Sequence, residues 1–393
     1  MLKLNRLLFA TAEEVFINSI EPTKDQRRVL VEAKNEIRDH LRPRIREATI
    51  KALGMDKAVT PRFRTQGSWS YQTCVQPAWH PPQEMDWDFG VYLPASVWEE
   101  SGPPHAMAQL YFKLVEGLLK DLCKEKGWKL YSGKDTCIRV QINAWAHIDI
   151  PLYAAPEAQF AQIVEKRVFD AAAKSDAREA LAAEFAEEDF TLQQWEDMVD
   201  IMMATRSGEW KPSDPEEVSR WFLDRVEEHT EQLQRVCRYL KAWRDLHWKA
   251  GDGPTSVCIM IAVAQAFEPK RGRDDVALER SARALSIALK GNVREPAIAE
   301  GKEDFNKRLD ANGRQHASTL AATLASQIQA ARMKASHLAG DAIDILRAQL
   351  GSRVPYRTDL VEPDSGDDVV RLRKPDALDH RVHCNVTTRA TST

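Results

Sequence analysis

Two aspartates one residue apart, Asp86 and Asp88, stand in a segment that alternates polar and apolar residues, QEMDWDFGVYLP. In an extended strand successive side chains point to opposite faces, so both carboxylates project from one face while Met85, Trp87 and Phe89 line the other. Two carboxylates this close repel each other unless a cation lies between them, and oxygen ligands suit Mg²⁺ or Mn²⁺ better than zinc. The spacing predicts a catalytic divalent-metal site for nucleotidyl transfer, with a solvated strand edge as the alternative.

The pair Gly67-Ser68 precedes this strand and offers a way to hold a phosphate group. Glycine lets backbone N–H groups approach an anion closely, and a helix that opens after Ser68 would direct its positive end at the same anion. Taken alone, the pair fits an ordinary turn with Ser68 as a helix cap better than a phosphate site. Because the two strand aspartates follow it, we expect Gly67 and Ser68 to contact the phosphates of a nucleotide.

A third acid for two-metal chemistry should come from a neighbouring strand, and Asp149 meets this requirement. Residues 138–143 alternate apolar and polar types, and after a short turn Ile148 and Ile150 flank Asp149. An aspartate is disfavoured inside a strand without a partner, so a plain surface-facing aspartate is the weaker interpretation. We predict that Asp86, Asp88 and Asp149 are catalytic and together hold two Mg²⁺ or Mn²⁺ ions.

Helices are predicted on either side of these strands. Thr23 and Gln26 form a candidate capping box, after which apolar residues recur at helical spacing until Pro43 interrupts them. A second amphipathic helix is expected over about 102–126, where it would cover one face of the sheet. The apolar run 257–267 is too short to cross a bilayer and is expected to form a buried helix. The pattern predicts an α+β fold.

The chain is predicted to divide into two lobes. Residues 1–210 would form the catalytic lobe with its long N-terminal helix, and residues 211–393 a helical C-terminal lobe with a flexible tail. Alanine and glutamate dominate from about 156 to 203 without a strand signal, so solvated helices are expected there, followed by a loop over 207–212. In the second lobe Arg238 and Lys241 share a helix face that could reach the cleft.

Composition indicates an enzyme of the cytoplasm rather than a binder of long nucleic acids or membranes. The 393 residues carry 55 Lys and Arg against 59 Asp and Glu, a net charge of −4, so no basic field favours either partner. The six cysteines include no CxxC pair, and reduced thiols are expected. The apolar run that follows Lys3 and Arg6 is too short for a signal peptide.

Four motifs in this order resemble the bacterial cGAS/DncV-like nucleotidyltransferases, or CD-NTases, and within them the cyclic GMP-AMP synthase branch. They are TPRFRTQGS (60–68), QEMDWDFGVYLP (83–94), HIDIPLYA (147–154) and RVCRYLKAWRD (235–245). The likeness runs from about Thr60 to about Pro269. It implies a polymerase-β-like nucleotidyltransferase core with a mixed sheet, a helical second lobe, and an active site in the cleft between them.

The resemblance also implies a set of nucleotide-binding residues. The matching positions are Gln66, Ser68, Arg139, Lys241 and Ser256. In the related synthases the lysine and the last serine contact the donor triphosphate, and an ammonium group and a hydroxyl both donate hydrogen bonds to phosphate oxygens. Tyr71 is a candidate for stacking on a base, although a tyrosine after a turn is more often simply packed.

The implied reaction joins nucleoside triphosphates, ATP and GTP by analogy, into a cyclic dinucleotide such as cGAMP and releases pyrophosphate. The product would be a second messenger of bacterial anti-phage (CBASS) signalling that acts on a downstream effector. Conjugation of the C-terminus to a partner by ubiquitin-like machinery is a further implied partnership. Two alternatives stay open: a terminal nucleotidyltransferase that adds nucleotides to an RNA or protein acceptor, and an inactive nucleotide-binding interaction protein.

Overall fold

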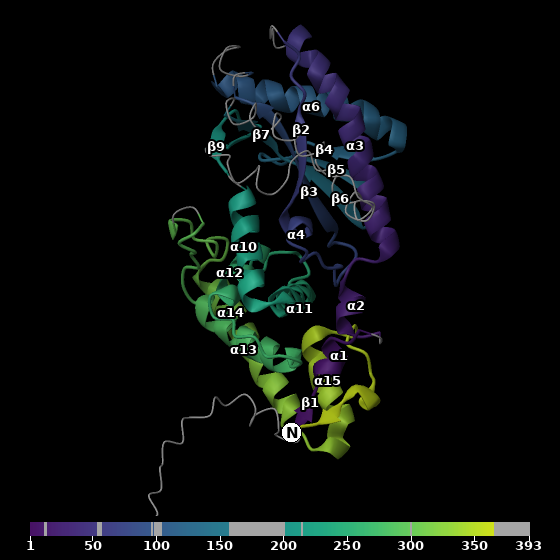
Figure 1. Cartoon of the computed structure of the whole chain (residues 1–393), viewed down its shortest axis with the longest axis vertical. Coiled ribbons are helices and arrows are strands. Elements are labelled where there is room, and N and C mark those ends of the chain that lie inside the picture. The colour runs from purple at the N-terminus through teal and green to yellow at the C-terminus, as the bar shows by residue number, and fades with distance from the viewer. Residues whose placement is uncertain are drawn as a thin grey trace, which may run out of the picture.

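The computed structural model describes residues 1–11, 14–52, 57–95, 97, 104–156, 201–213, 215–298 and 301–364. In these residues eight strands form one mixed sheet in the order β4-β5-β6-β3-β7-β8-β9, with β2 paired to β3 outside this path (Figure 1). The strands are β2 (Arg62–Gln66), β3 (Met85–Pro94), β4 (Lys129–Tyr131), β5 (Ile138–Asn143), β6 (Ala146–Ile150), β7 (Leu152–Ala155), β8 (Met202–Ala204) and β9 (Trp210–Pro212).

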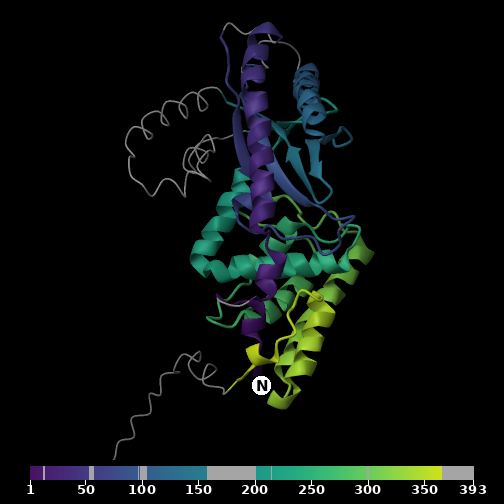
Figure 2. The ribbon, with the colours of Figure 1, turned by 90° about the vertical axis from the view of Figure 1, so that its right-hand side faces the viewer.

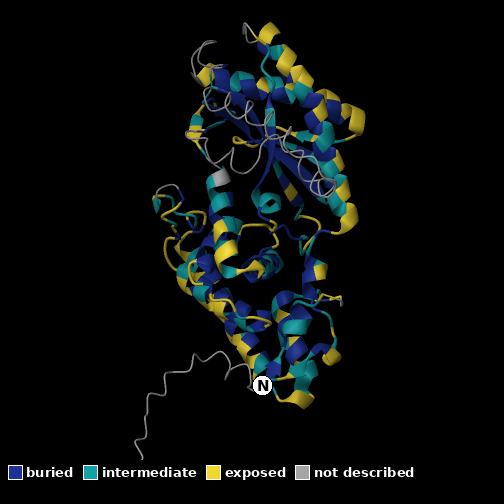
Figure 3. Cartoon of the chain, in the orientation of Figure 1, coloured by how far each residue is buried: buried dark blue, intermediate teal, exposed yellow. Residues whose placement is uncertain are grey.

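The long strand β3 organises the sheet because it pairs with three other strands. Its first half runs parallel to β6, its second half runs parallel to β7, and β2 lies antiparallel along it. The apolar stripe predicted for β3 is confirmed, since Met85, Trp87 and Phe89 are all buried. Figure 3 shows the strands as the most buried layer of this lobe.

Two long helices, α3 (Lys24–Lys51) and α6 (Pro104–Lys126), pack on each other and cover the sheet (Figure 2). The capping box at the start of α3 is confirmed, because Gln26 N donates to Thr23 Oγ1 at 3.1 Å and Thr23 N donates to Gln26 Oε1 at 2.8 Å. The prediction that Pro43 interrupts this helix is wrong, since α3 continues to Lys51. Leu41 and Ile45 are fully buried on either side of the proline, and this packing keeps the helix continuous.

Two further predictions are wrong at their ends, because β8 begins within the segment 156–203 that was expected to lack strands, and β9 lies within the loop predicted over 207–212. β8 pairs antiparallel with β7, where Tyr153 lies opposite Met203, and β9 pairs with β8 around a turn at 205–209. Strands of three residues carry too little sequence pattern to be recognised, and they form here because the edge of the sheet supplies their hydrogen bonds. The expected helices of 157–200 lie outside the described residues.

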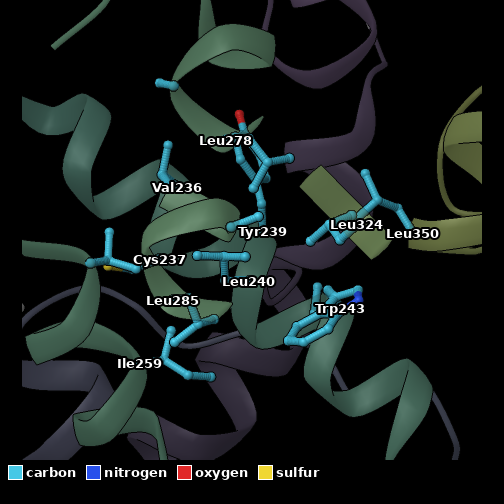
Figure 4. Packing of buried hydrophobic residues seen from close by; sticks show 14 of the residues in the cluster. Val236, Cys237, Tyr239, Leu240, Trp243, Ile259, Leu278, Leu285, Leu324 and Leu350 are labelled. Carbon is cyan, nitrogen blue, oxygen red and sulfur yellow. The ribbon is translucent and has the colours of Figure 1, made fainter. Parts of the chain in front are cut away.

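The second lobe is helical, as predicted. Its elements are α10 (Pro215–His229), α11 (Glu231–His247), α12 (Ser256–Ala264), α13 (Asp274–Ala288), α14 (Ala311–Arg332), α15 (Ala339–Leu350) and the short 3₁₀ turns η2 (Ser336–Leu338) and η3 (Thr358–Leu360). The apolar face of α11, including Val236, Leu240 and Trp243, is fully buried (Figure 4). The run predicted as a buried helix forms α12. None of the helices described is both long enough and apolar enough to cross a membrane.

The described residues among the first twenty pack with the helical lobe. They form β1 (Leu2–Lys3), α1 (Asn5–Leu8) and α2 (Phe16–Ile20), and their buried side chains belong to the same cluster as the core of α11 and α13. β1 also pairs with β10 (Glu362–Pro363), and Leu4 N donates to Asp275 Oδ2 at 3.0 Å. The division near residue 210 stays a prediction, but these first residues lie with the second lobe because their leucines fill its core.

Candidate active site

The three predicted catalytic aspartates lie on one face of two adjacent parallel strands. In the register of β3 with β6, Asp88 is opposite Asp149 and Asp86 is opposite His147. Neighbouring strands are about 4.8 Å apart, so the register places Asp88 and Asp149 side by side. Asp86 is exposed at the open end, Asp88 is half-buried, and Asp149 is buried.

Gly67 is required at the turn that follows β2, because it passes directly over Asp88. Its φ of +62° belongs to the left-handed region, and a Cβ at this position would lie 2.2 Å from Asp88 Oδ2. The helix α4 begins at this glycine, not after Ser68, and spans only Gly67–Ser70. A single turn has little dipole, so any phosphate contact here depends on individual N–H groups and on the Ser68 hydroxyl.

Asp149 is held by two cations. Arg139 Nε donates to Asp149 Oδ1 and Arg139 Nη2 to Oδ2, both at 2.7 Å, and Lys134 Nζ donates to Oδ2 at 2.7 Å. Burial alone would raise the pKa of Asp149, but the hydrogen bonds and charge of Arg139, with the bond from Lys134, lower it to about 2. Asp149 is therefore an ionised carboxylate whose oxygens are already bonded.

The pKa of Asp88 is shifted in the opposite direction to that of Asp149. Burial, followed by the negative charges of Asp86 and Asp149, raises the pKa of Asp88 to about 7. No hydrogen bond or ion pair from a cation to this carboxylate compensates within the part of the chain that the structure describes. Like charges gathered in this way are stabilised by a cation bound between them.

The donor chemistry of this face fits Mg²⁺ or Mn²⁺, since it consists of carboxylate oxygens around a carboxyl with a raised pKa. Among the described residues, however, no three His, Cys, Asp or Glu side chains are arranged to hold a metal ion together. The ligand set of Asp86, Asp88 and Asp149 therefore stays a prediction. In the structure Asp149 is turned toward Arg139 and Lys134, which bond its oxygens.

A cavity of about 620 Å³ opens beside the aspartates and extends between the two lobes. Asp86 and Asp88 line its sheet side, and Lys241, Arg244 and Ser256 line its helical side. Acids thus face cations across the cavity. Such a distribution suits a ligand that carries both metal-bound phosphates and free phosphate oxygens.

Lys241 and Ser256 reach the cavity, as predicted, but both are also bonded within the protein. Lys241 is buried, its Nζ donates to Thr73 O at 2.6 Å, and burial lowers the pKa of the ammonium. Ser256 Oγ accepts a hydrogen bond of 3.0 Å from Arg244 Nη1 at the start of α12. A phosphate that contacts these groups has to compete with short internal bonds.

Gln66 and Tyr71, two of the predicted nucleotide-binding residues, make side-chain contacts within the protein. The Gln66 amide lies in a buried network, where its Nε2 donates to the Tyr92 hydroxyl and its Oε1 accepts from Tyr153 at 3.2 Å. Gln66 is absent from the cavity lining, and so is Gly67. Tyr71 borders the cavity, yet its ring packs edge-on against Phe222 with the ring centroids 5.7 Å apart. Stacking of Tyr71 on a base stays a prediction.

Several residues at or beside the site were not singled out by the sequence analysis. His147 lies at the site, where its Nδ1 is 2.7 Å from Glu84 Oε2. His147 stands two residues before Asp149, and Glu84 stands two residues before Asp86, so period-two spacing could have found both. Arg244 lies one helical turn beyond Lys241 and was equally accessible to spacing arguments. Lys134 comes from the loop between β4 and β5, where no sequence signal marks it.

Two family models match the chain. The model described as the nucleotidyltransferase domain of cyclic GMP-AMP synthase DncV-like proteins matches residues 61–153, and the model of the cyclic GMP-AMP synthase C-terminal domain matches residues 230–363. The chain is 37% identical to a cyclic GMP-AMP synthase of Vibrio cholerae over 217 residues, which are 53% of this chain and 48% of that protein. A cyclic GMP-AMP synthase of Escherichia coli strain TW11681 is 33% identical over 280 residues, 67% of this chain and 61% of that protein.

The matched part therefore spans about half the length of the first of these relatives. Among solved structures, Vibrio cholerae DncV in complex with the linear intermediate 5′ pppA(3′,5′)pG is similar with a TM-score of 0.72 and 23% identity, covering 92% of this chain and 99% of that chain. Escherichia coli DncV bound to 3′-deoxy GTP is similar with a TM-score of 0.69 and 23% identity, covering 93% and 100%. These likenesses confirm the predicted fold, a nucleotidyltransferase core joined to a helical lobe.

Proposed function

Because the chain belongs to the family of DncV-like nucleotidyltransferases, we propose that it joins nucleoside triphosphates into a cyclic dinucleotide and releases pyrophosphate. The relatives that it matches are cyclic GMP-AMP synthases, so ATP and GTP are the substrates that we assign. The observation that carries the proposal is the register of β3 and β6, which brings Asp88 beside Asp149 at the edge of a cavity lined with cations.

On the sheet side, the aspartates supply the negatively charged oxygens that would bind divalent ions. Asp86 and Asp88 would hold divalent ions, joined by Asp149 when its oxygens are released. Mg²⁺ or Mn²⁺ bound in a pair supplies charge neutralisation of the triphosphate and lowers the pKa of the attacking ribose hydroxyl. Gly67 leaves room for Asp88 beside the turn.

On the helical side, Lys241 and Ser256 would bind the triphosphate, with Arg244 behind the serine. These groups orient the α-phosphate so that the hydroxyl oxygen attacks in line, a new P–O bond forms, and the bond to pyrophosphate breaks. The reaction occurs twice to close the ring. The second step uses the triphosphate that remains on the linear intermediate.

The wider setting follows from the same assignment. The cyclic product would act on a downstream effector in anti-phage signalling, and the protein would work in the cytoplasm. Conjugation of the C-terminus to a partner concerns residues 365–393, which lie outside the described residues.

The assignment is tested by incubating the protein with the four NTPs and Mg²⁺ or Mn²⁺ and identifying products by mass spectrometry. We expect a cyclic dinucleotide from the unmodified chain and none from the Asp86→Asn/Asp88→Asn variant, whose Tm should not fall below that of the unmodified chain. The matched control replaces two exposed aspartates outside the cavity, Asp121→Asn/Asp344→Asn, and should keep full activity. Undiminished synthesis by the first variant would refute the proposal, and nucleotides added to an RNA or protein acceptor would favour a terminal transferase.

A further inference from the structure

Lys134 bonds a predicted metal ligand, although neither the sequence motifs nor the cavity lining includes it. Its Nζ donates to Asp149 Oδ2 at 2.7 Å, the oxygen that also accepts from Arg139 Nη2 at the same distance. The other oxygen accepts from Arg139 Nε. Three charge-assisted hydrogen bonds therefore converge on one carboxylate, and any further cation that binds Asp149 has to displace a donor or share an oxygen with it.

Lys134 differs from an ordinary surface lysine, because hydrogen bonds from another part of the fold hold the backbone around it. Arg206 Nε donates to Lys134 O at 3.0 Å, and Arg206 N donates to Asp135 O at 2.7 Å. Ser207 N donates to Asp135 Oδ1 at 2.8 Å. The turn between β8 and β9 thus fixes the backbone of the β4–β5 loop at the point where the Lys134 side chain reaches the site.

The two cations on Asp149 differ in how easily they can leave. Arg139 is the register neighbour of Asp149 on β5 and uses a planar, two-bond fork. Lys134 makes one bond from a flexible stem, and its side chain is 44% exposed, so water can solvate the ammonium as soon as it separates. A competing ion would therefore displace Lys134 before Arg139.

We propose that Lys134 is a positioning residue that acts through Asp149, as an internal monovalent cation that a divalent ion must displace to use Asp149 Oδ2. The inference rests on the proposed function, because it assumes that the aspartates bind Mg²⁺ or Mn²⁺. Lys134 then sets the concentration at which the divalent ion fills the site. It also keeps the carboxylate neutralised and oriented until that ion arrives.

The test measures Mn²⁺ binding to the full chain without nucleotide, at pH 8, from the electron paramagnetic resonance signal of free Mn²⁺. We expect Lys134→Gln to bind Mn²⁺ about two- to fivefold more tightly, the range in which half-exposed ion pairs contribute. Lys134→Arg keeps the charge and should restore the original affinity. Lys211→Gln is the matched control, because Lys211 is 47% exposed on the adjoining hairpin and pairs with Glu209 and Asp135.

Unchanged or weaker Mn²⁺ binding by Lys134→Gln would overturn the inference, as would an equal gain in Lys211→Gln, which would mean a general charge effect. Structural damage cannot imitate the expected result, since damage would weaken binding. If Asp86→Asn/Asp88→Asn does not weaken Mn²⁺ binding, both the metal site and this inference fail. If that variant loses Mn²⁺ while Lys134→Gln equals the unmodified chain, only the role of Lys134 fails.

Discussion

At the scale of single residues, two aspartates of the site have pKa values that are shifted in opposite directions. Asp149 and Asp88 are neighbours in the strand register, yet the pKa of Asp149 is lowered to about 2 and that of Asp88 is raised to about 7. Both are affected by burial, but Arg139 and Lys134 bond only Asp149. The charges of Arg139 and Lys134 lower the pKa of Asp88 less than burial, Asp86 and Asp149 raise it, so Asp88 is the acid that a divalent ion would stabilise most.

This asymmetry predicts opposite effects on stability in buffer that contains EDTA. The raised pKa of Asp88 means that the stability it contributes is complete below about pH 4 and is lost as the pH rises through about 7. Asp88→Asn should therefore raise Tm by a few degrees at pH 8 and by less at pH 5. Asp149→Asn should lower Tm at both values, because it leaves Arg139 without its partner.

Differential scanning calorimetry of the two variants and the unmodified chain at the two pH values checks this pair of signs. A fall in Tm for Asp88→Asn at pH 8 would show that Asp88 makes compensating contacts. An unchanged Tm for Asp149→Asn would show that the Arg139 fork contributes little.

At the scale of elements, α11 couples the two lobes through one row of side chains. Gln234 Nε2 donates to Tyr71 O at 3.2 Å, Arg238 Nη2 donates to Gln72 O, and Lys241 Nζ donates to Thr73 O at 2.6 Å. Positions three and four apart lie on the same face of a helix, so the row meets three consecutive carbonyl groups. The segment after α4 is therefore held by the helix that also contributes Lys241 to the cavity.

Variants of this row should separate its structural role from nucleotide binding. Gln234→Leu removes one bond to the segment 71–76 and Lys241→Met removes two bonds to Thr73, so both should increase amide hydrogen exchange there. Only Lys241→Met should weaken NTP binding, by about tenfold or more, because a charge-assisted phosphate contact is lost. Isothermal titration with a non-hydrolysable NTP and exchange mass spectrometry provide the two measurements. Unaltered NTP affinity in Lys241→Met would restrict the lysine to a structural role.

At the scale of the whole molecule, the cavity lies where the two lobes meet, and side chains of both lobes line it. The sheet supplies the aspartates, and α11 and α12 supply the cations and the serine. The N-terminal segment crosses from one lobe to the other, since buried side chains of β1, α1 and α2 pack with the helical core whereas α3 packs on the sheet. The N-terminal segment therefore joins the two lobes through contacts other than those that line the cavity.

The crossing can be tested with two equivalent leucines, Leu4 and Leu30, which are both fully buried but belong to different clusters. Leu4→Ala and Leu30→Ala should each cost about 2–5 kcal/mol of unfolding free energy. In amide exchange, Leu4→Ala should loosen α13 first and Leu30→Ala should loosen α6 and the sheet first. Loosening of the sheet by Leu4→Ala would place the first residues with the catalytic lobe instead.

The sequence by itself determined the parts that rest on local periodicity and motif order. Alternation along 85–89 was sufficient to place Asp86 and Asp88 on one face of a strand, alternation along 146–150 placed Asp149 on a second strand, and the capping box predicted the start of α3. The order of the motifs was sufficient to recognise the family. These signals are local because side chains return to the same face every two residues in a strand and about every four residues in a helix.

Only the tertiary structure decided what those residues contact. Pro43 lies within a continuous helix, β8 and β9 exist, Gln66 turns into a tyrosine network, and Lys134 bonds Asp149. Each of these depends on a partner far along the chain: sheet packing on α3, the edge of β7, the hydroxyl of Tyr92, and the hairpin that fixes the β4–β5 loop. Burial and pairing of this kind are set by the three-dimensional arrangement, which spacing along the chain does not encode.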